Sequence, residues 1–345
     1  MRKKKFPVIP VIIIAALLIG AAVLIAVSNQ RRGEVRVLMT EMAAATETAS
    51  VPTATPTAEP TSVPTETPTE VLTEELPTEE PTAAPALDPA DWKNWPELPE
   101  SISPELKAMY FEGIEEGNDP ARFSKVGDSN TVMPSFLGCF DSGEGTGYDL
   151  GPYEELQEVI EQFQWSFSRN SRAAKNGATA YDMDVYHWYT DDVCWPYESA
   201  LSCEYRLFTP SIAFIGFGTN DALLDIDLYE EHLRSLVQKT SDRKIVPILL
   251  TKADDLEGDG SFNEVTAKIA AEFNVPLWNL WKAMSALPNN GLKDGDVHPT
   301  SSDVSLCNFA GSDLENYGWT VRNLSALKAL DRVWRLLNDL PLNEY

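Results

Sequence analysis

The feature that most constrains this chain is a series of short apolar runs in its second half, each ending at a turn signal or a helical pattern. The runs cover residues 122–126, 211–217, 244–250 and 275–279. Apolar side chains recur at helical spacing in the segments 227–239, 261–273 and 321–337. Continuous apolar strands that alternate with amphipathic helices are typical of a parallel sheet covered on both faces. The sequence therefore predicts an α/β domain.

Three polar segments lie where such a fold places its ligands, beyond the carboxyl ends of the strands. They read Gly127-Asp128-Ser129-Asn130, Gly218-Thr219-Asn220-Asp221 and Asp294-Gly295-Asp296-Val297-His298. A serine at a strand-to-helix turn becomes a nucleophile when a base lies beside it. An asparagine at a strand end can donate to a developing oxyanion. Each segment alone is better explained as a turn, but their order along the chain suggests one site.

Only three histidines can supply the base. His232 lies in the middle of a predicted helix, so we expect it at the surface. His187 lies between tyrosine and tryptophan, so we expect it to pack among rings. His298 has aspartates on its N-terminal side and follows the last predicted strand. We therefore expect His298 to be the base, oriented by a neighbouring aspartate.

Together, Gly-Asp-Ser, Gly-x-Asn-Asp and an aspartate-containing histidine loop resemble the SGNH/GDSL hydrolase family over nearly all of residues 120–340. The resemblance implies a flavodoxin-like three-layer α/β/α fold with a mainly parallel sheet. It implies ester cleavage without a metal or other cofactor. Ser129 matches the nucleophile, and its own N–H joins the oxyanion hole. Asn220 matches the oxyanion asparagine, His298 the base, and Gly177 is the best match for a second backbone donor.

The acid departs from the family pattern, because Asp-x-x-His would place it at position 295, which is a glycine. Asp294 comes one residue early and Asp296 one residue late. We expect Asp296, two residues before His298, to point away from it in an extended loop, so we slightly favour Asp294. The alternatives are Asp296, reached through a bulged loop, or a Ser-His dyad without an acid.

The N-terminus predicts a membrane anchor over residues 1–30. Basic residues fill positions 2–5, and a nearly unbroken apolar run follows from 8 to 27. Twenty helical residues span ~30 Å, the thickness of a bilayer core. The basic cluster favours a cytoplasmic N-terminus with the remainder outside the cell. The alternative is a cleaved signal peptide, which would make the protein secreted.

Residues 31–90 predict a disordered linker. Within them, proline recurs at every fourth position from 52 to 68 and again from 77 to 89, with threonine and glutamate between. Such a segment cannot bury enough apolar surface to offset its chain entropy. We therefore place the linker between the anchor and a hydrolase domain at residues 91–345.

Four cysteines fall in that domain, where an oxidising location would allow disulfides. Cys194 and Cys203 lie close in sequence, which favours that pair and leaves Cys139 with Cys307. Three connectivities are possible for four cysteines. No spacing typical of a zinc site occurs.

The charge constrains the partners. The net charge is −26, and residues 1–90 hold eleven acidic and seven basic residues, so residues 91–345 have a net charge of −22. This acidity argues against nucleic acid, which needs a basic surface. It also disfavours polyanionic substrates and direct docking on anionic lipid. We expect a monomer that meets the membrane only through its N-terminal helix.

The function predicted from these features is an extracellular serine esterase that removes acyl groups, such as acetyl, from a neutral glycan or small ester. One alternative is an acyltransferase that modifies a polysaccharide. Another is a non-catalytic glycan-binding module, suggested by the displaced aspartate and by an aromatic insertion at residues 181–205. For that insertion, we favour rings packed on the core over an exposed sugar platform.

Overall fold

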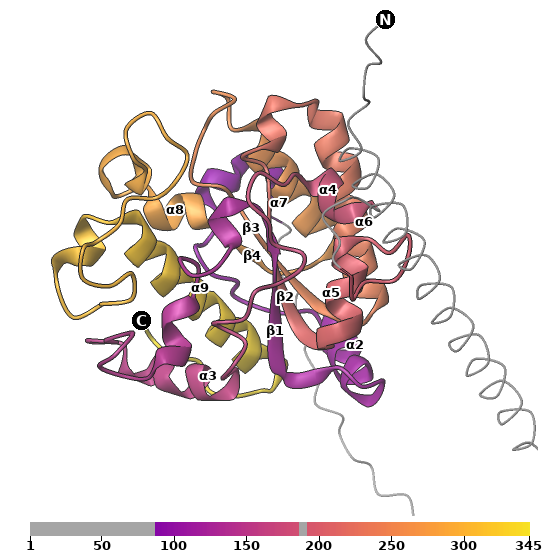
Figure 1. The fold of residues 1–345 in the computed structure, drawn as a ribbon, viewed down its shortest axis with the longest axis horizontal. Helices are drawn as coiled ribbons and strands as arrows, with labels where there is room; N and C mark the ends of the chain where they lie inside the picture. Colours follow the sequence, from indigo (N-terminus) through magenta and orange to yellow (C-terminus); the bar gives the residue numbers. More distant parts are fainter. Residues whose placement is uncertain (1–86, 186–191) are drawn as a thin grey trace, which may run out of the picture. The chain divides into compact units, whose positions relative to one another are not determined.

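A computed structural model describes residues 87–185 and 192–345 (Figure 1). Its centre is a parallel sheet in the order β1-β2-β3-β4. The strands are β1 (Asp119–Gly127), β2 (Pro210–Gly216), β3 (Val246–Leu250) and β4 (Leu277–Trp278). The four predicted strands are therefore present, although β4 is shorter than expected. Lys244 adopts a left-handed turn with φ of 58°, so β3 begins later than predicted.

The sheet continues beyond β1 through one parallel bridge, between Gly127 and Ala174. Gly127 donates to Ala173 O at 2.9 Å, and its carbonyl accepts from Lys175 N at 3.0 Å. The segment around Ala174 comes second along the chain. The parallel segments therefore follow the spatial order 2-1-3-4-5, which is the flavodoxin-like order.

Helices lie on both faces of the sheet (Figure 1). One face carries α3 (Gln157–Gln162) and α9 (Gly318–Leu337), with α8 (Leu280–Met284) beside α9. The other carries α5 (Ala200–Phe208), α6 (Ile226–Asp242) and α7 (Ser261–Phe273), with α4 (Ala180–Asp184) packed on α5 and α6. α2 (Pro104–Glu115) contacts β2 and β3.

Local signals explain where these helices begin. Ser103 caps α2 by accepting from Leu106 N at 3.1 Å, and Pro104 occupies the first turn. Thr179 and Asp182 form a reciprocal capping box on α4. The α6, α7 and α9 helices match the predicted helical segments, with α7 having the predicted bounds.

Short 3-10 turns fill much of the remaining described chain. They are η1 (Pro89–Asn94), η2 (Ser129–Thr131), η3 (Gly138–Ser142), η4 (Glu154–Leu156), η5 (Asp221–Leu223), η6 (Pro288–Gly291) and η7 (Ser312–Glu315). Because η1 begins at Pro89 and is capped by Asp88, the predicted linker boundary at residue 90 is slightly too late. The remainder of the predicted linker, and the predicted anchor, lie outside the described residues. Within residues 87–185 and 192–345, no helix has the length and apolarity needed to cross a membrane.

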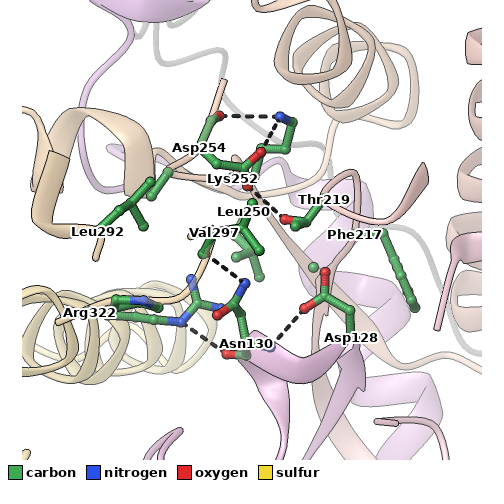
Figure 2. A pocket seen from close by; sticks show the side chains of 13 residues that line it. Asp128, Asn130, Phe217, Thr219, Leu250, Lys252, Asp254, Leu292, Val297 and Arg322 are labelled. Carbon is green, nitrogen blue, oxygen red and sulfur yellow. Dashed lines mark hydrogen bonds and ion pairs between the residues drawn. The ribbon is translucent and has the colours of Figure 1, made fainter. Parts of the chain in front are cut away.

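The carboxyl ends of the strands surround a small cavity (Figure 2). Asp128 follows β1, Phe217 follows β2, and Leu250 ends β3. Arg322 reaches the same cavity from α9. The polar segments that follow β1 and β2 therefore meet at one edge, as the sequence predicts.

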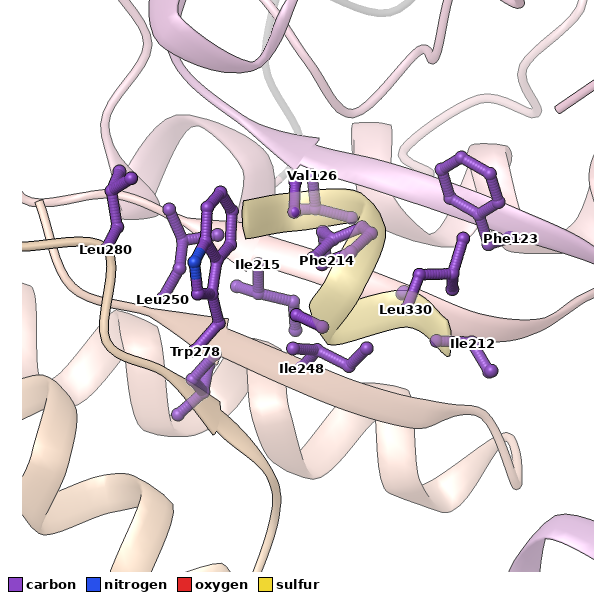
Figure 3. Packing of buried hydrophobic residues seen from close by; sticks show 14 of the residues in the cluster. Phe123, Val126, Ile212, Phe214, Ile215, Ile248, Leu250, Trp278, Leu280 and Leu330 are labelled. Carbon is purple, nitrogen blue, oxygen red and sulfur yellow. The ribbon is translucent and has the colours of Figure 1, made fainter. Parts of the chain in front are cut away.

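The core covers both faces of the sheet, and Figure 3 shows the part that lies between the sheet and α9. Phe123, Phe214 and Trp278 come from three different strands, and each is fully buried. Phe214 meets both Phe123 and Trp278 edge-on, with ring centroids 5.9 Å apart in each pair. Leu330 of α9 packs over these strands. This apolar layer holds the sheet rigid beneath the loops at its carboxyl edge.

Both favoured disulfides form, joining Cys139 to Cys307 and Cys194 to Cys203. The first bond connects the region after η2 to the segment before α9, across 168 residues of sequence. It therefore links the segment that follows Ser129 to the segment that follows His298.

Candidate active site

Ser129 and His298 lie in direct contact, although 169 residues separate them in sequence. Ser129 begins η2, immediately beyond β1. His298 lies in the loop after α8. The Ser129 Oγ and His298 Nε2 atoms are 2.9 Å apart. A hydroxyl in this position can pass its proton to the ring.

The turn that carries Ser129 is fixed by its neighbours. The Asp128 carboxylate accepts from Asn130 N at 2.8 Å and so caps η2. A side chain at Gly127 would come within 2.4 Å of Thr131 Oγ1 and 2.5 Å of Gly216 O, so only glycine fits there. Burial raises the pKa of Asp128 to about 6.

Asp296, not Asp294, contacts the histidine. Asp296 Oδ1 lies 2.6 Å from His298 Nδ1 and accepts from the backbone N–H groups of Val297 and His298. The hydrogen bond to His298 is the largest cause that lowers the pKa of Asp296. Its position on Nδ1, opposite the serine, is the one that orients the ring in a serine triad.

The structure does not support the preference for Asp294, for two reasons. Side chains two residues apart in an extended segment share a face, and this segment also turns at Gly295. Gly295 has φ of 68°, and Asp296 N donates to Lys293 O at 3.1 Å, which closes a turn. The turn brings Asp296 back to its own backbone and to His298. Asp294 is exposed and forms no hydrogen bond with any residue that the structure describes.

Asn220 and Gly177 lie on neighbouring loops. Asn220 Nδ2 donates to Ala178 O at 3.0 Å, next to Gly177. A primary amide has two N–H groups, so one remains for a ligand. Gly177 has φ of 74°, which favours glycine. The parallel pairing of Gly127 with Gly216 and with Ala174 brings these loops to either side of Ser129.

Asp221 links the same loops and was not singled out from the sequence. Its carboxylate accepts from Ala180 N at 2.9 Å and from Gly218 N at 3.0 Å. It is 3% exposed, and burial raises its pKa. The Asn-Asp pair after β2 was the available signal, because a buried strand end often needs a side chain to satisfy its backbone donors.

Arg322, which lies far from Ser129 in sequence, contacts the turn that carries it. Its Nε donates to Asn130 O at 3.1 Å, in the turn that carries Ser129 (Figure 2). The side chain is 4% exposed, and burial lowers its pKa to about 10, while Asp128 and Asp254 oppose that shift. The sequence offered no signal for this contact, because Arg322 lies inside a helical pattern.

The cavity between Arg322 and the strand ends measures about 20 Å³, enough for one water. Asn130 Oδ1 is buried beside it and has no hydrogen-bond partner among the residues that the structure describes. Across the cavity, Asp254 accepts from Thr219 Oγ1 and pairs with Lys252 Nζ, both at 2.7 Å. The floor of the site is thus a layer of buried polar and charged groups.

The other two histidines do not join the site. His232 is 9% exposed, and its Nδ1 lies 2.7 Å from Asp184 Oδ2. The expectation that it lies at the surface was wrong, because α4 packs on α6 and covers it. His187 lies outside the described residues.

The aromatic insertion is only partly packed on the core. Tyr205 is 2% exposed, whereas Trp195 and Tyr197 are 62% and 83% exposed. Trp195 is in contact with Arg206, whose guanidinium lies 4.1 Å from the ring centroid. The expectation of core packing therefore fails for two of these three rings.

Comparison with known proteins decides the family. The model of the GDSL-like lipase/acylhydrolase family matches residues 126–302, just over half of the chain. This chain belongs to that family. The matched region includes Ser129, Gly177, Asn220, Asp296 and His298. As a GDSL-type hydrolase, the protein is a serine esterase, which agrees with the resemblance read from its motifs.

Solved structures resemble this GDSL-type hydrolase at low sequence identity. An acetylxylan esterase from Geobacillus stearothermophilus is 18% identical, with a TM-score of 0.38, covering 62% of this chain and 95% of its own. A GDSL-like lipase from Bacteroides thetaiotaomicron is 15% identical, with a TM-score of 0.38, covering 66% and 98%. No curated protein matches the chain significantly.

Proposed function

We propose that Ser129 is the nucleophile of this esterase and that His298 is its general base. The observation that supports this most directly is the line of contacts from Ser129 Oγ through His298 to Asp296, at 2.9 Å and 2.6 Å. In this arrangement Asp296 holds the ring in the tautomer that accepts at Nε2 and stabilises the imidazolium. The altered spacing of the acid therefore gives no support to a non-catalytic module.

The reaction proceeds through an acyl-enzyme. Ser129 Oγ attacks the ester carbonyl while His298 Nε2 takes its proton. The tetrahedral oxyanion accepts hydrogen bonds from the N–H groups of Ser129 and Gly177 and from the remaining Asn220 amide hydrogen. The alcohol leaves with the proton from Nε2. Water then attacks the acyl-Ser129 ester with His298 again as base, which releases the acid and restores the hydroxyl.

The substrate that we propose is an acylated glycan or a small ester, with acetyl as the simplest acyl group. The domain's net charge of −22 disfavours a polyanionic chain. We further propose that residues 1–30 anchor the enzyme in the cell membrane and that the proline-rich segment holds the domain outside the cell.

Hydrolysis of nitrophenyl acetate, butyrate and octanoate tests this function. We expect the wild type to release nitrophenol fastest from acetate. Ser129→Ala and His298→Ala should lower kcat by about three powers of ten or more. Ser301→Ala, in an exposed position beyond the histidine loop, is the control and should retain activity. A wild type that turns over none of the esters would overturn the proposal.

A further inference from the structure

A second cavity, of about 380 Å³, lies against the turn that carries Ser129. One wall is formed by residues 131–133, directly after Ser129 and Asn130. The other wall includes Lys175 and Asn176, directly before Gly177. Lys175 N donates to Gly127 O at 3.0 Å, which fixes this wall to the end of β1. The volume falls in the range of small-ligand sites, and the position is beside the proposed reaction centre.

The lining of this cavity is polar and basic, although the domain around it is acidic. Lys125 and Lys175 both line it, and no aspartate or glutamate does. The other polar side chains along the walls are those of Thr131, Asn170, Ser171 and Asn176. Amides and hydroxyls of this kind suit the hydroxyl groups of a sugar.

Neither lysine forms an ion pair with a carboxylate within residues 87–185 and 192–345. Lys125 is 2% exposed, and its Nζ donates to two backbone carbonyls, Phe167 O at 2.8 Å and Phe136 O at 3.4 Å. These bonds use two of the three hydrogens of an ammonium group. Lys175 forms no ion pair with any residue in the described part of the chain.

Burial of Lys125 lowers the pKa of its side chain. Desolvation by burial and, to a smaller extent, the like charge of Arg169 lower its pKa to about 7, while Asp141 opposes the shift. A bound anion would favour the charged ammonium and stabilise both partners. An anion bound in this cavity would therefore meet two lysines and no carboxylate among the residues that line it.

We propose that this cavity binds the carboxylate of an acidic sugar that carries the scissile acyl group. The proposal rests on the esterase function and narrows its substrate to an acylated hexuronate or a similar sugar acid. The sequence predicts a neutral substrate, and this proposal changes that prediction by adding one carboxylate to the sugar that carries the acyl group. The acidic surface still repels a polyanion at long range, whereas a single carboxylate meets two lysines within the cavity, where solvent screening is weak.

The test compares two substrates on the full-length protein. One is a mono-O-acetylated methyl hexuronoside, and the other is its uronamide, in which a neutral amide replaces the carboxylate. At low salt we expect kcat/KM for acetate release to favour the acid by about tenfold. Lys175→Gln and Lys125→Met should each reduce that ratio severalfold. Lys268→Gln, at an exposed position on α7, should leave it unchanged.

Binding to Ser129→Ala separates this proposal from the esterase function. Calorimetry with the uncleaved substrates should show about tenfold tighter binding of the acid, lost when Lys175→Gln is added. Equal binding of acid and amide, or a preference that survives both lysine substitutions, would overturn the carboxylate site. A wild type that binds the acid selectively but hydrolyses no ester would instead overturn the esterase function alone.

Discussion

Asp296 is exposed, yet it contacts the ring of His298, the proposed base, through a hydrogen bond of 2.6 Å. The contact depends on the left-handed turn at Gly295, which folds the carboxylate back onto His298 Nδ1. A carboxylate in this position stabilises the imidazolium as it forms, which is a transition-state effect. Its contribution should therefore be visible in kcat more than in KM.

Substitution of the two aspartates distinguishes them. Asp296→Asn should lower kcat on nitrophenyl acetate by about two to four powers of ten, because it removes the charge and favours the wrong tautomer. Asp294→Asn is the matched control, with the same chemistry two positions away, and should retain kcat within about twofold. Equal losses in the two variants, or loss only in Asp294→Asn, would show that Asp296 has no such role.

Lys125 makes folding stability depend on pH. Its pKa falls to about 7 in the folded chain from an ordinary value of 10.5. Between these values the unfolded chain binds more protons, so this group adds stability as pH rises from 7 to about 10.5. Lys125→Met lacks the titration and should exceed the wild type in stability most below pH 7, with the gain shrinking towards pH 10.

Urea midpoints at pH 6, 8 and 9.5 measure this gain. Lys268→Met, at an exposed site on α7, controls for the simple loss of a cation. A difference between Lys125→Met and wild type that stays constant across the three pH values would contradict a buried, desolvated ammonium.

At the scale of elements, α9 contacts the turn that carries Ser129, the proposed nucleophile. Arg322 binds Asn130 O. The next residue of α9, Asn323, accepts from Leu137 N at 2.9 Å and donates to Ser135 O and Leu306 O. The helix therefore positions the chain on both sides of the Cys139–Cys307 bond. This makes Arg322 a positioning residue, since it acts on Ser129 through the turn.

Substitution of Arg322 by alanine should lower kcat and leave KM unchanged. A charged hydrogen bond of this kind contributes about 1.5–3 kcal/mol, so Arg322→Ala should lose about 10- to 100-fold in kcat. Guanidinium ion at non-denaturing concentrations should restore part of it, whereas sodium at equal ionic strength should not. Arg332→Ala, on the same helix, is the control. A loss that guanidinium leaves unchanged would indicate a structural defect only.

The sequence predicts the elements of this fold better than its contacts. Strands and the long helices have strong local signals: apolar runs, and apolar stripes such as the one on α9. Ser129, Asn220 and His298 could be singled out from the sequence because each follows a predicted element. Asp296 was misjudged because one left-handed glycine decides the path of its loop. The contacts of Arg322 and His232 arise from packing between distant segments, which no local pattern encodes.

At the scale of the whole molecule, the predicted membrane anchor determines whether the enzyme's activity is found in the membrane fraction or in the soluble fraction of a cell lysate. Activity of the full chain should remain with membranes after alkaline carbonate extraction, because an apolar run of 20 residues is held by the bilayer core. Deletion of residues 1–30 should move activity to the soluble fraction with kcat unchanged. Full-length activity in the soluble fraction would contradict an uncleaved anchor and favour the signal-peptide alternative.

In the proposed reaction, Ser129 is activated by His298 and attacks the acyl carbon of the ester. Mass spectrometry after reaction with a fluorophosphonate probe tests it most directly. We predict one adduct per chain, on the peptide that contains Ser129, absent in Ser129→Ala and formed at least about a hundredfold more slowly in His298→Ala. An adduct that persists in Ser129→Ala, or its absence from the wild type under conditions of ester turnover, would contradict the claim.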